Sequence, residues 1–448
     1  MKSIVIKQAN IVNEGKVFVG DILIEEGIIK DIGHLNETSD KIVINGAGKY
    51  ILPGIIDSHV HFREPGLTHK GDIYTEAKAA VAGGITSFIE MPNTIPNTLT
   101  SALIKEKEKI ASEKSLANYS FYLGINAKNY EELLHVDKST VGAITDDGLY
   151  FSGTGNMLSN NPDYMQKLFA SADSIISLHC EDESIVEDNL RIACERYGDN
   201  IPIGEHTHIR SEEACYQATL RVLEMAKKCN TRLHLLHLST AKEAKLFSND
   251  VHISDKRVTS EVCIHHLWFC DDDYKTLGVQ IKWNPSVKKK ADRDELMRAL
   301  NDDRIDIVST DHAPHTLAEK QQNYINSPSG GPMVQHALVV MLELVKQKAI
   351  AIEKVVEKMC HNPAILFGIE KRGFIRIGYY ADLVIVGMNQ KWKVDSSNIL
   401  YKCGWSPFMG YTFSSAVCTT IVNGHIVYDQ EIFDESEMGK QLTFKSQE

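Results

Sequence analysis

The stretch Ile55–Gly66 (IIDSHVHFREPG) places metal-ligating and anion-binding side chains directly after an apolar run. Alternate residues of a β-strand point to the same side, so His59 and His61 share one face. Neutral imidazole is a good ligand for zinc and similar ions, so the pair predicts part of a metal site. Arg63 follows on the same side and offers a charged, planar fork that suits a substrate carboxylate.

Further residues of the metal-binding type follow four other predicted strands. They are Asp147 after residues 141–145, His179 after 174–178, His237 after 232–236 and Asp311 after 304–309. Four histidines and two carboxylates suffice for two divalent ions that share a bridge, and such ions lower the pKa of bound water. Asp311 is placed to take a proton from water and return it to a leaving nitrogen, as a general acid and base does.

The elements that must position these residues alternate between strand and helix patterns. The remaining strand candidates are the run that leads into His59 and residues 85–91, 119–125 and 257–263. Eight strands with helices between most of them predict an α/β fold, a (β/α)8 TIM-type barrel. Active sites of such barrels lie at the carboxyl ends of the strands, which is where the candidate ligands stand.

Both ends of the chain have a β pattern instead. The dipeptide Asn423–Gly424 between two apolar runs is typical of a type I′ hairpin. We therefore expect one small β-sandwich-like domain built from residues 1–52 and 366–448, and a barrel domain from residues 53–365. The polar stretch 434–448 is expected to form a loose tail.

Composition excludes several classes of partner. The net charge of −12 argues against nucleic acid and against an anionic membrane surface. Nine cysteines without a C-x-x-C pair indicate reduced thiols rather than a disulfide framework. No signal-peptide pattern and no apolar run long enough to span a bilayer is present. We expect a soluble cytoplasmic protein.

Some histidines are set aside as ligands. His206 and His208 repeat the spacing of the first pair, but they follow Gly204 in a polar segment rather than an apolar strand. His265 and His266 come just past the seventh strand candidate. We expect these two side chains to pack or to orient other groups.

The motif DSHVHFREPG at residues 57–66 resembles that of the dihydroorotases in the cyclic-amidohydrolase superfamily. The resemblance covers nearly the whole chain. Further motifs recur in the same order: MPN at 91–93, DDG at 146–148, HCE at 179–181, RLHLLHLST at 232–240, NPSV at 284–287 and STDHAPH at 309–315.

This resemblance implies a zinc enzyme that interconverts N-carbamoyl-L-aspartate and (S)-dihydroorotate plus water, the third step of de novo pyrimidine (UMP) synthesis. It implies two zinc ions per subunit, bridged by Asp147 and a hydroxide, and a homodimer. His59, His61 and Asp311 would hold the first ion, and His179 and His237 the second. Asp311 would also be the catalytic acid and base. The implied substrate contacts are His61, Arg63, Asn93, Asn284, His315, Ser329 and Gly330.

The bridging ligand distinguishes subgroups of this superfamily. Many relatives, among them hydantoinases and allantoinases, use a carboxylated lysine at the end of strand four, but residues 141–148 contain no lysine. Type I bacterial dihydroorotases carry the second aspartate of an Asp-Asp-Gly there, which matches Asp147. An allantoinase or a dihydropyrimidinase/hydantoinase-type enzyme stays an alternative. A catalytically dead scaffold or assembly partner is another, although all six ligand positions hold competent residues.

Overall fold

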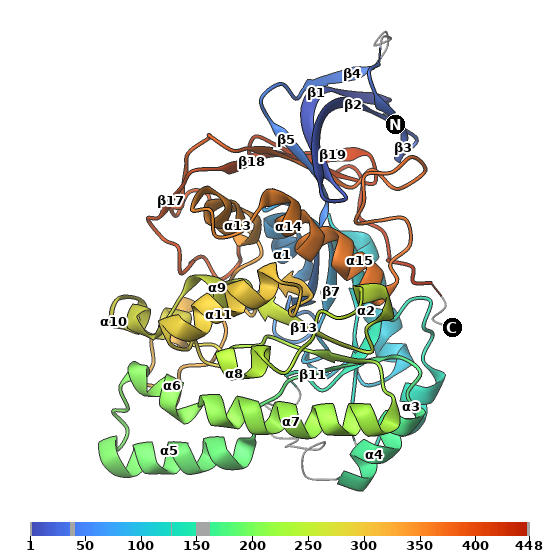
Figure 1. Ribbon diagram of the computed structural model, residues 1–448. Helices are drawn as coiled ribbons and strands as arrows, with labels where there is room; N and C mark the ends of the chain where they lie inside the picture. Colours follow the sequence, from blue (N-terminus) through green and yellow to red (C-terminus); the bar gives the residue numbers. More distant parts are fainter. Residues whose placement is uncertain (1, 36–40, 127, 149–161, 446–448) are drawn as a thin grey trace.

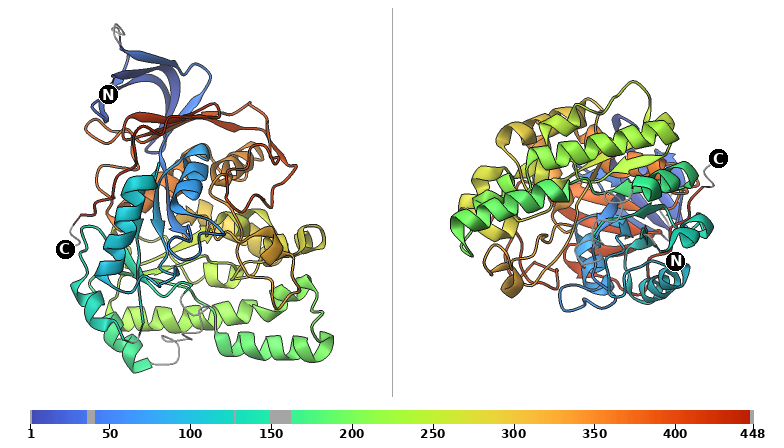
Figure 2. Two further views of the ribbon diagram at one scale, coloured as in Figure 1. Left: turned by 180° about the vertical axis from the view of Figure 1, so that it is seen from behind. Right: turned by 90° about the horizontal axis from the view of Figure 1, so that it is seen from below.

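A computed structural model describes residues 2–35, 41–126, 128–148 and 162–445 (Figure 1). It shows a barrel surrounded by helices, with a β-sheet domain at one end. Helices α5, α6 and α7 lie at the end of the molecule furthest from this domain (Figure 1). The N-terminus lies in the β domain and the C-terminus beside the barrel (Figure 2).

Eight strand positions form the barrel, as predicted. The strands are β6 (Ile55–Val60), β7 (Ile85–Glu90), β8 (Asn118–Phe121), β9 (Leu123–Gly124), β10 (Ala143–Thr145), β11 (Ile175–Leu178), β12 (Leu233–Leu235), β13 (Val258–Cys263) and β14 (Ile307–Ser309). Neighbours pair in parallel, and Tyr122 divides the third position into β8 and β9. A parallel bridge between Val60 and His312 closes the ring between β6 and the end of β14.

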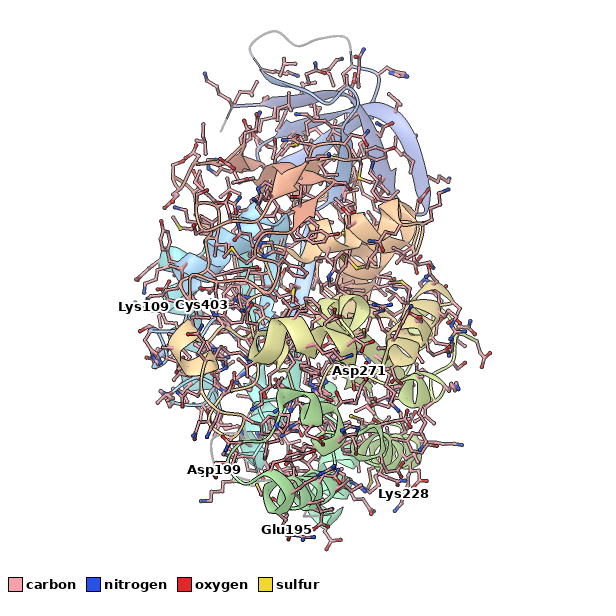
Figure 3. All side chains as sticks on the ribbon, turned by 90° about the vertical axis from the view of Figure 1, so that its left-hand side faces the viewer. Lys109, Glu195, Asp199, Lys228, Asp271 and Cys403 are labelled. Carbon is pink, nitrogen blue, oxygen red and sulfur yellow. The ribbon has the colours of Figure 1, made fainter. Side chains whose placement is uncertain are left out.

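Helices follow the barrel strands along the chain. They are α1 (Ile73–Ala82), α2 (Ser101–Lys114), α3 (Tyr130–His135), α4 (Pro162–Ser171), α5 (Glu183–Tyr197), α6 (His206–Ile209), α7 (Glu212–Cys229), α8 (Ala241–Ala244), α9 (Ile264–Trp268), α10 (Tyr274–Leu277), α11 (Lys290–Asn301), α12 (Leu317–Lys320), α13 (Ala337–Lys346), α14 (Ile352–Val356) and α15 (Asn362–Phe367). Charged side chains such as Glu195 and Lys228 cover the exposed faces of α5 and α7 (Figure 3). No helix among the described residues is long and apolar enough to cross a membrane.

The sequence fixes where helix α1 begins and ends after the motif that contains Arg63. The Asp72 carboxylate accepts a hydrogen bond from Thr75 N at 2.8 Å and caps the first turn. The helix ends at Ala82 with Gly83 as its C-cap residue, and Gly84 has a φ of +85° that few other residues adopt without strain. The first turn of α1 thus follows shortly after the motif that contains Arg63, and the cap at Asp72 fixes the loop between this motif and the helix.

The β domain combines both ends of the chain, as predicted. Its sheet runs in the order β20-β19-β18-β15-β5-β1-β2-β3, with β4 also paired to β1. These strands are β1 (Ile4–Asn13), β2 (Lys16–Glu25), β3 (Ile28–Gly33), β4 (Ile42–Asn45), β5 (Tyr50–Pro53), β15 (Leu383–Gly387), β18 (Ala416–Val422), β19 (His425–Asp429) and β20 (Ile432–Phe433). A separate pair is formed by β16 (Trp392–Lys393) and β17 (Thr412–Phe413). Asn423 and Gly424 have φ values of +51° and +78°, which confirms the type I′ turn.

The prediction of a loose C-terminal tail is wrong for the part that the structure describes. Leu442 and Phe444 are buried, and Leu442 N donates to Tyr119 O at 2.8 Å. Both side chains join an apolar cluster with Tyr122 and Phe367. The tail is therefore held because Leu442 and Phe444 cover the barrel; residues 446–448 lie outside the described chain.

Candidate active site

Four imidazoles and two carboxylates converge at the carboxyl ends of five barrel strands. The carboxylate of Asp147 lies at their centre. Its Oδ2 is 3.5 Å from His59 Nε2 and 3.4 Å from His61 Nε2. Its Oδ1 is 3.6 Å from His179 Nδ1 and 3.7 Å from His237 Nε2. Each oxygen thus faces one pair of histidines, which is the arrangement of a bridging ligand.

Asp311 lies on one side of this cluster. Its Oδ1 is 3.4 Å from His59 Nε2 and 3.2 Å from His61 Nε2. The structure therefore brings together the six predicted ligands in the predicted grouping, with Asp311 beside His59 and His61.

Three site residues have left-handed backbone conformations. The φ values are +71° for Arg63, +37° for His237 and +47° for Asp311. This region is costly for residues other than glycine, and such residues concentrate at functional sites. In each case the turn follows the end of a strand and redirects the side chain.

Charge in the cluster favours a bound cation. Burial alone would raise the pKa of Asp147, but the neighbouring imidazoles of His179, His237 and His59 hold the pKa of this carboxyl well below its usual range. Burial opposes the charged form of His179, yet the neighbouring carboxylates of Asp147 and Glu181 raise the pKa of the imidazole to about 9. Buried carboxylates need positive charge nearby. Neutral imidazoles do not supply it, but a bound metal ion does.

The distances between donor atoms suit metal ions. In each of two groups, His59 with His61 and Asp147, and Asp147 with His179 and His237, the donors lie within 4.8 Å of one another. Four ligands at about 2.1 Å in a tetrahedron lie about 3.4 Å apart, close to the spacing around Asp147. His59 Nε2 is buried and has no hydrogen-bond partner among the described residues. The residues present therefore fit a metal centre.

In three of the imidazoles, the ring nitrogen that faces away from Asp147 lies at hydrogen-bond distance from an acceptor. His59 Nδ1 lies 2.6 Å from Glu261 Oε1, His179 Nε2 lies 2.9 Å from Glu181 Oε2, and His61 Nδ1 lies 2.7 Å from Asn93 Oδ1. A proton on each of these nitrogens donates to the acceptor, which leaves a lone pair on the nitrogen that faces Asp147. This is the tautomer that a metal ligand requires.

Sequence reasoning missed Glu181 and Glu261 as functional residues. Glu181 stands two positions after His179, and in an extended chain residues two positions apart point to the same side. This spacing could have predicted that the two side chains lie together. Glu261 is a charged residue inside the otherwise apolar or small-residue strand β13, and its side chain is fully buried. Its Oε1 also accepts from His237 N at 3.3 Å, so one carboxylate contacts both groups of ligands.

Replacing Glu261 by glutamine is expected to lower metal affinity about 10–100-fold, because the charge that orients His59 is lost. Competition with a chromophoric chelator measures this affinity. Glu243→Gln is the matched control, since Glu243 is a buried glutamate that accepts from Thr219 and Thr240. An equal loss in both variants, or none in Glu261→Gln, would contradict a role in metal binding.

A cavity of about 600 Å³ opens next to the cluster. It is lined by His61, Asp147 and Asp311 on the side of the candidate ligands. All seven predicted substrate contacts also line it: His61, Arg63, Asn93, Asn284, His315, Ser329 and Gly330. The cavity therefore joins the predicted metal ligands to the predicted substrate contacts.

Arg63 is a buried cation at this cavity. Its guanidinium donates from Nε to Pro314 O at 3.1 Å, and its Nη2 lies 3.2 Å from His315 Nε2. Burial lowers the pKa of Arg63 to about 10, so the group stays charged at neutral pH. No carboxylate among the described residues forms an ion pair with it. Burial of a cation without an ion-pair partner is costly, so the cavity presents a guanidinium to which an anion can bind.

The segment around Gly330 closes one wall of the cavity. Ser329 Oγ donates to Asn284 Oδ1 at 2.9 Å, and Ser329 O lies 3.0 Å from His315 Nε2. Gly330 has a φ of +117°, and a Cβ there would lie 2.6 Å from Ala313 O. Only glycine permits this approach, so the segment is held against the strand end that carries the candidate acid and base.

Four basic residues in the lining of this cavity were not predicted as site residues: Lys70, His206, Arg210 and Lys282. His206 is bonded through both ring nitrogens, to the Tyr324 hydroxyl and to Trp283 O, each at 2.7 Å. It lies apart from the metal-type cluster, as expected when it was set aside as a ligand. Arg210 forms an ion pair with Glu181, which connects the cavity wall to His179.

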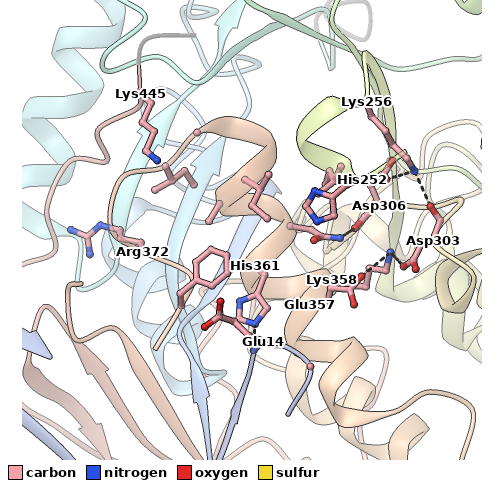
Figure 4. A pocket seen from close by; sticks show the side chains of 18 of the residues that line it. Glu14, His252, Lys256, Asp303, Asp306, Glu357, Lys358, His361, Arg372 and Lys445 are labelled. Atoms are coloured by element: carbon pink, nitrogen blue, oxygen red, sulfur yellow. Dashed lines mark hydrogen bonds and ion pairs between the residues drawn. The ribbon is translucent and has the colours of Figure 1, made fainter. Parts of the chain in front are cut away.

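A larger cavity, of about 840 Å³, lies beside α15 and the tip of the β1–β2 hairpin (Figure 4). Two of its lysines pair with aspartates of the same lining. Lys256 pairs with Asp306 at 2.7 Å and Lys358 with Asp303 at 2.8 Å. It contains no predicted site residue, so the chemistry belongs to the smaller cavity.

Comparison with known proteins agrees with this geometry. The model of the amidohydrolase family matches residues 50–427. Dihydroorotases from Methanosphaera stadtmanae and Carboxydothermus hydrogenoformans are 31% and 33% identical, over 97% and 95% of this chain and 98% of each relative. The solved L-hydantoinase (dihydropyrimidinase) from Arthrobacter aurescens has a TM-score of 0.90 at 25% identity, over 99% of this chain and 100% of its own.

A dihydropyrimidinase structure from Brevibacillus agri, with a TM-score of 0.87 at 22% identity over 99% of this chain and 100% of its own, supports the barrel fold alone. The matching relatives span the whole described architecture, including the β domain formed by both chain ends. The chain therefore belongs to the amidohydrolase family, within its dihydroorotase group of cyclic amide hydrolases.

Proposed function

We propose that this protein catalyses the reversible cyclisation of N-carbamoyl-L-aspartate to (S)-dihydroorotate and water, with two zinc ions per subunit. One observation carries the proposal: the buried guanidinium of Arg63, which has no carboxylate partner among the described residues, shares a cavity with the metal-type cluster. Dihydroorotate has a carboxylate next to a cyclic imide. A single cavity with both an anion site and a metal centre is suited to both groups.

His59, His61 and Asp311 would hold one ion, His179 and His237 the other, and Asp147 would bridge them. Their donor atoms lie at the spacing described above. Bound metal ions supply Lewis acidity, which makes water a stronger nucleophile and polarises the carbonyl that it attacks.

The protein's own groups then perform the proton transfer and the positioning. In ring opening, Asp311 takes the proton of the attacking water and returns it to the imide nitrogen as the carbon–nitrogen bond breaks. Arg63 and Asn284 hold the substrate carboxylate, and His315 Nε2 lies 3.2 Å from the Arg63 guanidinium. Asn93 orients His61 and lines the cavity beside it.

Removing the metal tests this proposal. Chelation is expected to abolish turnover of dihydroorotate, and about two equivalents of zinc per chain are expected to restore it, because both groups around Asp147 must be filled. Turnover is followed in both directions, alongside metal analysis. Full activity in the chelated protein would contradict the proposed function.

Two alternatives make different predictions. An allantoinase or hydantoinase-type enzyme has no strict need for a substrate carboxylate, so Arg63 would be dispensable. A catalytically dead scaffold would bind no metal, although competent side chains stand at all six candidate positions. We further propose a homodimer in the cytoplasm, which rests on the resemblance to dihydroorotases; light scattering tests the dimer.

A further inference from the structure

Lys70 is a lysine at the cavity to which neither the motifs nor the mechanism assigns a role. Its Nζ lies 3.1 Å from His315 Nδ1 and 3.1 Å from Glu319 Oε1. Glu319 is fixed in turn, because its carboxylate accepts from Thr316 N and Thr316 Oγ1 at 2.9 Å in the capping box of α12. The ammonium is thereby held between a helix terminus and the imidazole.

The contacts of His315 decide which of its nitrogens carries the proton. Lys70 offers only donors, so its bond to Nδ1 requires a lone pair there. The proton then sits on Nε2 and donates to Ser329 O at 3.0 Å. The opposite tautomer would place two donors against each other at Nδ1 and two acceptors at Nε2. Burial and the neighbouring cations Arg63 and Lys70 lower the pKa of His315 well below its usual range, so the ring is neutral.

This tautomer has a consequence for Arg63. The guanidinium Nη2 lies 3.2 Å from His315 Nε2, and a protonated Nε2 cannot accept its hydrogen bond. With the other tautomer, Nε2 would accept from Arg63 and occupy part of its fork. The contact with Lys70 therefore keeps the Nη2 donors of Arg63 available.

We propose that Lys70 is a positioning residue for substrate binding: by fixing the tautomer of His315, it reserves the Arg63 fork for the substrate carboxylate. This role of Lys70 rests on the proposed function, and it explains how the Arg63 fork stays available for the substrate carboxylate. Lys70 acts through His315, and its own charge is balanced by Glu319.

Lys70→Met tests the inference. It is expected to raise the KM for dihydroorotate and the Kd for N-carbamoyl-L-aspartate about 10-fold, the effect of losing one charged hydrogen bond in the site, with kcat changed less than about twofold. Lys70→Arg keeps a donor and is expected to restore binding. Lys78→Met is the matched control, because Lys78 has a similar ion pair with Glu435 at 2.6 Å, outside the cavity.

A double-mutant cycle separates action through His315 from direct contact. In a His315→Ala background, Lys70→Met is expected to change KM and Kd less than about twofold. An equal effect in both backgrounds would overturn the proposal, because Lys70 would then contact the substrate itself. An unchanged KM in Lys70→Met, or a loss confined to kcat, would overturn it as well.

The binding measurement separates this inference from the proposed function. If wild-type protein binds N-carbamoyl-L-aspartate but turns over neither substrate, the proposed function fails while the cycle of Kd values still decides the role of Lys70. If wild-type protein does not bind N-carbamoyl-L-aspartate, both the proposed function and the role of Lys70 are contradicted.

Discussion

Replacing Asp311 by asparagine is expected to lower kcat about 10²–10⁴-fold, the range for loss of a general acid and base. Asp311 lines the cavity, and its Oδ1 lies 3.2 Å from His61 Nε2, between the ligands and the substrate space. An amide can still ligate a metal through its oxygen, but it cannot take the proton of water. Steady-state kinetics in both directions, with zinc analysis of the variant, measure the effect.

The control for this variant is Asp306→Asn. Asp306 is a buried carboxylate that precedes the same strand, β14, and accepts from Lys256 Nζ and Ser260 N. Its loss is expected to lower the melting temperature and leave kcat unchanged. Substantial turnover by zinc-loaded Asp311→Asn would remove Asp311 as the acid and base.

Replacing Arg63 by methionine is expected to raise the KM for dihydroorotate about 10–100-fold, because the substrate carboxylate loses its charged hydrogen bonds. The same change is expected to leave the melting temperature unchanged or higher, because it removes a buried cation that no carboxylate pairs with among the described residues. Higher stability with lower activity is the signature of a residue kept for binding rather than for folding.

Arg63→Lys is the informative companion variant. Lysine keeps the charge but not the planar fork, so its KM is expected to lie between those of wild type and Arg63→Met. An unchanged KM in Arg63→Met would mean that another group holds the carboxylate. It would also favour the hydantoinase-type alternative over the dihydroorotase.

The candidate ligands were predictable because strand geometry limits where they can point. Period-two alternation put His59 and His61 on one face, and the barrel fold put residues such as Asp147, His179 and Asp311 at one end of the strands. Local signals were sufficient for the hairpin at Asn423–Gly424, because a type I′ turn depends on two residues alone.

The groups behind the ligands were not predictable in the same way. Glu261 contacts His59, 202 positions away, and Lys70 contacts His315, 245 positions away. Contacts of this kind depend on how the closed barrel aligns separate strand ends, which no local pattern encodes. The C-terminal tail was mispredicted for the same reason, since the value of burying Leu442 and Phe444 depends on a surface made elsewhere in the chain.

Dihydroorotase activity is tested most directly by comparing turnover of (S)-dihydroorotate, dihydrouracil and allantoin by the zinc-loaded wild-type protein, side by side. We expect turnover of dihydroorotate alone, since it is the carboxylate-bearing ring among the three. A preference for dihydrouracil or allantoin would contradict the proposed function, because Arg63 would then not recognise a substrate carboxylate.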